Sequence, residues 1–169
     1  LTFKQEAMSY AHHTEARVNV SAAAADVFAF LDDQEALGAH MTQSSAMMAG
    51  GRMIYELDEG RGRAVGSIIR MRGEMLGLTL RVEEVVTERV PPKRKVLETR
   101  GDQNMLLIKA YRLGFEIDAA GDGTAVCVFI DYDLPPGFLA IFAKLPAYFY
   151  ARWCVTGMAD AAVERFHAT

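Results

Sequence analysis

The chain changes its hydrophobic period at one place, Pro135-Pro136-Gly137, and this change limits the folds it can adopt. Before it, from about residue 52 to residue 134, apolar residues recur at every second position, as in strands that bury one face. After it, from Phe138 to about Phe166, they recur at helical spacing. The sequence therefore predicts an α+β domain in which a sheet is followed by one long helix.

Six strands are expected in the segment of period 2, because turn residues interrupt it at short intervals. Short connections of this kind place consecutive strands antiparallel. The predicted ranges are Arg52–Asp58, Ala64–Met75, Leu78–Val90, Lys93–Arg100, Leu106–Asp118 and Thr124–Leu134.

A further strand and two short helices are expected before this segment. Glu15–Val20 alternates polar and apolar residues and predicts the first strand of the chain. Ser21 is expected to cap a helix over Ala22–Leu31, and a second helix is expected from Gln34 to about Met41. Pro146 lacks an amide hydrogen and is expected to kink the long C-terminal helix.

A ligand cavity is expected between the sheet and the long helix. A helix of about 28 residues is about 42 Å long, which is enough to lie across the whole sheet. A curved sheet cannot touch a nearly straight helix along its full width, so a gap is expected between them. The side chains predicted to line it are Tyr55, Ile69, Met71, Tyr111 and Leu113 from strands, and Phe142, Leu145 and Phe149 from the helix.

Composition and spacing argue against several functions. The 18 Lys and Arg residues against 22 Asp and Glu residues give a net charge of −4, so no basic surface for nucleic acid is expected. The most apolar run, residues 137–151, is broken by Lys144 and Pro146, and we expect no stable membrane insertion. Cys127 and Cys154 have neither metal-site nor disulfide-framework spacing, which favours a reducing, cytoplasmic setting without metal or cofactor.

The order of these segments resembles a known superfamily. Residues 17–33, RVNVSAAAADVFAFLDD, are similar to the start of polyketide cyclase/dehydrase and lipid-transport proteins, the SRPBCC or START-like superfamily. Residues 65–77 and 82–92 resemble its central strands. The resemblance implies a helix-grip fold, in which a curved seven-stranded antiparallel sheet wraps around a long C-terminal helix. We expect this domain over residues 14–169, after an N-terminal extension over residues 1–13 that is either native or in part a cloning remnant.

The resemblance also implies binding of a small or medium hydrophobic ligand of lipid, isoprenoid or polyketide-like type. An alternative is a cyclase or dehydratase that acts by acid/base chemistry without a metal or covalent intermediate, and a third is an interaction module. Convergent polar groups in the cavity would favour the enzyme. An apolar wall with a wide mouth would favour a carrier, and an occluded cavity the interaction module. The ligand is not identified, and a homodimer is left open.

Three kinds of polar residue are candidates for a role in the cavity. His40 is expected near the cavity mouth, where it would exchange a proton near neutral pH, or else at the surface as the end of a short helix. Tyr55 and Tyr111 either orient a ligand carbonyl or hydroxyl, or are core tyrosines bonded to the backbone. Arg152 either pairs with a ligand carboxylate or enolate, or extends into solvent.

Overall fold

A computed structural model describes residues 9–37, 53–75, 78–101, 103–105 and 107–167. Seven strands form one antiparallel sheet in the order β1-β7-β6-β5-β4-β3-β2. The strands are β1 (His12–Val20), β2 (Met53–Leu57), β3 (Ile68–Met75), β4 (Leu78–Val90), β5 (Arg94–Thr99), β6 (Ala110–Ala120) and β7 (Gly123–Asp133). The long helix α3 (Leu139–His167) follows the last strand. This is the predicted helix-grip fold.

The sheet follows the predicted strands closely, and β3 shows why some bounds differ. Its predicted start, Ala64, lies in a turn, and the strand begins at Ile68. The carboxylate of Asp58 holds this turn together, because it accepts hydrogen bonds from the Ser67 hydroxyl at 2.5 Å and the Ile68 amide at 2.7 Å. Arg61 has a φ of 49°, which a tight turn permits and a strand does not.

The first helix, α1 (Ala24–Leu31), begins later than predicted. Ser21 is not its N-cap: Ala23 occupies that position and makes no side-chain capping bond. The preceding residues are instead fixed to β7, since the Thr124 hydroxyl donates a 2.7 Å hydrogen bond to the Ala22 carbonyl. After α1, residues 34–37 are helical, and the rest of the second predicted helix lies outside the described residues.

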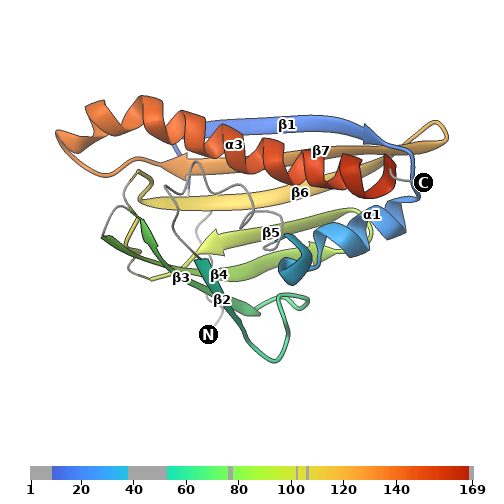
Figure 1. The fold of residues 1–169 in the computed structure, drawn as a ribbon, viewed down its shortest axis with the longest axis horizontal. Helices are drawn as coiled ribbons and strands as arrows, with labels where there is room; N and C mark the ends of the chain where they lie inside the picture. The colour runs from blue at the N-terminus through green and yellow to red at the C-terminus, as the bar shows by residue number, and fades with distance from the viewer. Residues whose placement is uncertain (1–8, 38–52, 76–77, 102, 106, 168–169) are drawn as a thin grey trace.

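Helix α3 has close to the predicted length but does not cross the whole sheet. It runs along β1 and β7 at one side of the sheet, with α1 near its C-terminal end (Figure 1). Its buried seam consists mainly of small side chains, which allow the helix to approach the strands closely. The buried residues of α3 are Ala143, Ala147, Ala151, Cys154, Val155, Met158, Ala159, Ala161 and Ala162.

The inward direction predicted for three large side chains of α3 is wrong. Phe142 and Leu145 are each 64% exposed, and Phe149 is 55% exposed. The alanine seam occupies the side of the helix that meets the sheet, so these larger residues point away from it. Within the described residues, no helix is both long enough and apolar enough to cross a membrane.

Two apolar clusters form the core that the described residues build. The larger one joins α1, β1, β6, β7 and α3 with Val82 of β4, and the smaller one consists of Ile69, Val86 and Leu97 from β3, β4 and β5. Half-buried Tyr55, Leu57 and Met71 pack against the smaller cluster. Both clusters include side chains of the inner face of the sheet, the face that is turned toward α3.

Candidate functional site on the inner face of the sheet

Strand register places a row of polar side chains across the inner face. Glu84 of β4 lies opposite Ile69 of β3 on one side and Thr99 of β5 on the other. The Thr99 hydroxyl accepts a 3.1 Å hydrogen bond from the Tyr111 amide and donates one of 3.3 Å to the Tyr111 carbonyl. Tyr111 of β6 is therefore held next in the row, opposite Tyr132 of β7.

Glu84 and Tyr111 form a buried hydrogen-bonded pair. The Tyr111 hydroxyl donates to Oε1 of Glu84, and Tyr111 and Glu84 are 8% and 3% exposed, respectively. Burial raises the pKa of Glu84 to about 7, although the Tyr111 hydrogen bond and the charge of Lys95 act in the opposite direction. Burial and the neighbouring Glu84 raise the pKa of Tyr111 well above its usual value. At neutral pH the pair therefore holds a tyrosine hydroxyl beside a carboxyl that exists in both protonation states.

Three further polar groups complete what we call the Glu84 cluster: Tyr55 of β2 with Tyr150 and Cys154 of α3. Burial raises the pKa of Tyr55 to about 12, and the charges of Glu84 and Cys154 add to this rise. Burial raises the pKa of Cys154 to about 12, although its hydrogen bond with Tyr150 lowers it. The charge of Cys154, then burial, raise the pKa of Tyr150 well above normal. These groups stay protonated at neutral pH, so Cys154 does not supply a thiolate nucleophile.

A second buried charge, Lys95, is already paired. Its side chain is 0% exposed, and its Nζ lies 2.8 Å from Oδ1 of Asp32 and donates to the Asp32 carbonyl at 3.2 Å. Arg89 donates to Oδ2 of the same carboxylate at 2.8 Å. Burial opposes ionisation of Asp32, but the hydrogen bonds from Arg89 and Lys95 lower its pKa overall. This triad fixes the end of α1 to β4 and β5.

A groove of about 390 Å³ lies between Leu37 and α3. Trp153, Cys154 and Gly157 are among the residues that line it. Apart from its chain neighbours and the adjoining backbone of α3, no described residue has an atom within 4 Å of where a Cβ of residue 157 would lie. Because Cys154 belongs both to the groove lining and to the Glu84 cluster, the groove is a candidate route to the inner face.

The sequence-predicted site residues divide into three groups. Those from the strands share the inner face around Glu84, and of these Ile69 and Tyr111 are buried while Tyr55, Met71 and Leu113 are half-buried. Those from the helix, Phe142, Leu145 and Phe149, are exposed, and His40 lies outside the described residues. Arg152 is exposed and lines the groove.

The main group that sequence reasoning missed is Glu84. The sequence does contain an indication of its position. Alternate residues of β4 point to the inner face, and these are Leu80, Val82, Glu84 and Val86. A charged residue on a strand face that is otherwise apolar is unusual. Tyr150 and Cys154 could be placed only once the buried seam of α3 was known.

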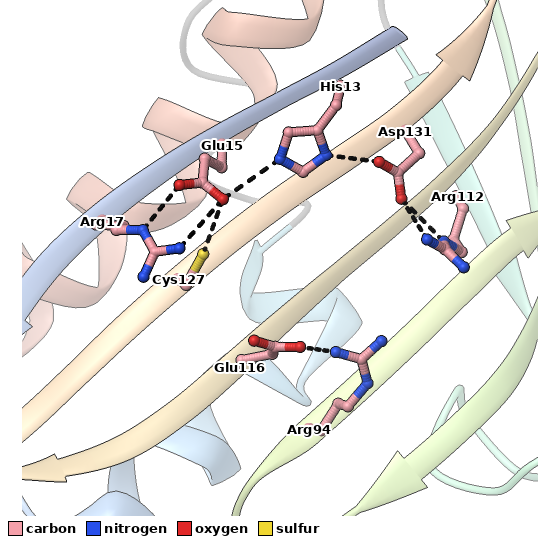
Figure 2. A network of polar contacts seen from close by, with 8 residues as sticks. All are labelled: His13, Glu15, Arg17, Arg94, Arg112, Glu116, Cys127 and Asp131. Carbon is pink, nitrogen blue, oxygen red and sulfur yellow. Dashed lines mark hydrogen bonds and ion pairs between the residues drawn. The ribbon is translucent and has the colours of Figure 1, made fainter. Parts of the chain in front are cut away.

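The opposite, outer face of the sheet carries a separate polar network (Figure 2). His13 Nδ1 lies 2.6 Å from Oδ1 of Asp131, and Arg112 donates to Oδ2 of Asp131 at 2.7 Å. Hydrogen bonding to Asp131 raises the pKa of His13. Nearby, Glu15 accepts a 2.8 Å hydrogen bond from Arg17. The network is largely exposed to solvent, where such pairs contribute little stability, and it is separated from Glu84 by the sheet.

These features define a helix-grip protein whose inner face carries a buried polar cluster. The chain belongs to the polyketide cyclase / dehydrase and lipid transport family, whose model matches residues 11–169. No curated protein matches the chain.

Solved structures of other proteins share the fold at low sequence identity. The protein TTHA0849 from Thermus thermophilus has a TM-score of 0.68 and 15% identity, covering 93% of this chain and 98% of its own. Truncated norcoclaurine synthase from Thalictrum flavum has a TM-score of 0.65 and 16% identity, covering 94% of both chains. A protein from Thermobifida fusca has a TM-score of 0.62 and 18% identity, covering 91% of this chain and 92% of its own.

Proposed function

We propose that this chain binds a small or medium hydrophobic ligand, of lipid, isoprenoid or polyketide-like type, between the inner face of the sheet and α3. The observation that carries the proposal is the buried Glu84–Tyr111 pair, which lies among the apolar side chains of the inner face. A buried carboxyl that has no cationic partner costs stability, and such costs are characteristic of functional sites. The polar group of the ligand would lie against this pair, and its apolar body against Ile69, Met71 and Leu113.

Native mass spectrometry of protein purified without denaturation tests ligand binding. We expect the wild-type protein to retain an apolar molecule. Met71→Trp should displace that molecule by filling the inner face, whereas Ile54→Trp, an exposed position on neighbouring β2, should not. Wild-type protein free of any bound molecule, or equal retention by both variants, would contradict the proposal.

A second candidate function is acid/base catalysis on a polyketide-like carbonyl compound, by a cyclase or dehydratase. The specific support is the pKa of Glu84, about 7, because a group that titrates near the working pH can both accept and return a proton. The hydroxyl of Tyr111 would supply a hydrogen bond to the carbonyl oxygen. The cluster also supplies the convergent polar groups that distinguish an enzyme from a simple carrier.

Deuterium exchange at the α-carbons of 2-tetralone in D₂O, followed by NMR, tests catalysis separately from binding. We expect the wild-type protein to accelerate exchange and Glu84→Gln to reduce the rate by about 10²-fold or more. Glu83→Gln is the matched control, because Glu83 lies on the outer face and pairs with Arg70. Exchange at the buffer rate would contradict catalysis of this kind and leave ligand binding intact. The cytoplasmic setting stays a prediction of the sequence.

A further inference from the structure

We infer that the Glu84 cluster selects a hydrophobic ligand that carries a protonated amine. This inference rests on the proposed ligand site and specifies the chemical class that the site takes. It follows from the hydrogen bonding of Glu84, the state of the groups that surround it, and the charges along the groove.

Glu84 has unused capacity to bind a cation. Its Oε1 accepts the hydrogen bond from Tyr111, whereas its Oε2 accepts none from the described residues, and none of the cations among them forms an ion pair with Glu84. A buried carboxylate is stabilised strongly by a cation that hydrogen-bonds to it. A ligand ammonium group would donate to Oε2 and supply that charge.

Within the described part of the chain, the groups that face Glu84 leave no free cation for a ligand carboxylate. Lys95 of β5 interacts electrostatically with Glu84, but its ammonium is bound to Asp32. The other titratable neighbours are Tyr55 of β2, Tyr111 of β6, and Tyr150 and Cys154 of α3, all neutral at physiological pH. Tyrosine rings in general also attract ammonium groups through their π faces.

The charged residues along the groove beside α3 also favour a cationic ligand over an anionic one. Arg152 lines it with one positive charge, and Asp160 and Glu164 line it with two negative charges. A ligand that approaches Cys154 along this groove therefore meets a net charge of 1 − 2 = −1. Such a field favours the approach of a cation over that of an anion.

Calorimetric titration with three ligands that share one apolar body tests the inference: 4-phenylbutylamine, 4-phenylbutanol and 4-phenylbutanoate. At pH 8 we expect the amine to bind about tenfold more tightly than the alcohol, and the carboxylate most weakly. The preference for the amine should shrink at pH 5.5, because Glu84 is then protonated while the alkylammonium keeps its charge.

Variants connect the preference to Glu84. Glu84→Gln should bind the amine no more tightly than the alcohol, whereas Glu83→Gln should keep the wild-type preference for the amine. Equal binding of amine and alcohol by the wild-type protein, or tightest binding of the carboxylate, would overturn the inference and leave the proposed ligand site standing. Failure of all three ligands to bind would overturn the proposed site and the inference with it.

Discussion

Lys95 and Glu84 are both buried and ionisable, but they differ in whether the protein supplies a partner of opposite charge. Lys95 is compensated within the protein, because its Nζ lies 2.8 Å from the carboxylate of Asp32, which also pairs with Arg89. Glu84 has a tyrosine hydroxyl for a partner and no cation bound to it among the described residues, so its charged form is disfavoured. The first arrangement stabilises the fold, and the second leaves a carboxyl whose preferred partner is a ligand or a proton.

The free energy of unfolding should depend on pH because Glu84 ionises less readily in the folded protein than in the unfolded chain. Its pKa is about 7 in the folded protein against an ordinary 4.5, so the folded state binds more protons than the unfolded state between these values. Its contribution to stability is therefore lost as pH rises from about 4.5 through 7. Relative to Glu84→Gln, the wild-type free energy of unfolding should fall by about 2–3 kcal/mol between pH 5 and pH 8.

Urea unfolding of the two proteins at both pH values measures this difference. The comparison cancels the contributions of all groups that titrate alike in both proteins. A pH-independent difference would show that Glu84 titrates normally.

At the level of elements, α3 shows what a hydrophobic pattern predicts and what it does not. Its extent, Leu139–His167, follows from the change of period and differs from the prediction by one residue at each end. Its orientation was predicted wrongly, because Phe142, Leu145 and Phe149 give a more hydrophobic stripe than the alanines that the sheet buries. Which stripe is buried depends on the space left by β1 and β7, and local sequence does not encode that space.

The same distinction applies to the sheet. Alternation predicts the inner faces of β4 and β6, because it is a property of each strand alone. It does not predict that Glu84 lies beside Thr99 and Tyr111, because that neighbourhood depends on the pairing of three strands. The candidate site was therefore only partly predictable, with its apolar wall expected and its carboxyl missed.

Substitutions on the two sides of α3 distinguish the buried seam from the exposed stripe. Ala151 is 0% exposed, so Ala151→Leu should overfill the contact with the sheet and destabilise the protein by about 1–3 kcal/mol. Phe142→Ala removes a larger but exposed side chain and should change stability by less than about 1 kcal/mol. Thermal unfolding followed by circular dichroism compares the stability of the two variants. A larger loss of stability for Phe142→Ala than for Ala151→Leu would support the orientation predicted from sequence.

The attachment of α1 to the sheet depends on Asp32. Asp32→Asn should destabilise the protein by about 3–5 kcal/mol, because it leaves Lys95 buried without its counter-ion. Asp33→Asn is the control: Asp33 forms an exposed ion pair with Arg63 at 3.0 Å, and asparagine keeps an oxygen that can cap the following helical residues. Its cost should stay below about 1 kcal/mol. Equal losses for the two variants in chemical denaturation would rule out a special role for the triad.

At the scale of the whole molecule, the core is unevenly distributed. The larger apolar cluster lies where α3 and α1 cover β1, β6 and β7, and the smaller one lies on β3, β4 and β5 (Figure 1). The two edge strands accordingly differ, because β1 has nine residues and is covered by α3, whereas β2 has five and, among the strands described, pairs with β3 alone. A ligand on the inner face would add contacts mainly beside the smaller cluster.

Hydrogen exchange should reveal this asymmetry in the protein freed of any ligand. Amide protection follows the free energy of local opening, which is larger where more apolar surface must be exposed. We therefore expect the amides of β1 that pair with β7 to exchange at least about tenfold more slowly than those of β2 that pair with β3, a difference of about 1.4 kcal/mol in opening free energy. Mass spectrometry of peptides from the two strands measures both rates in one sample.

Adding the molecule that co-purifies with the protein should slow exchange in β2 and β3 more than in β1. Equal protection of the two edges, or a ligand effect confined to β1, would show that the side of the sheet away from α3 is neither the weaker part of the fold nor part of the binding site.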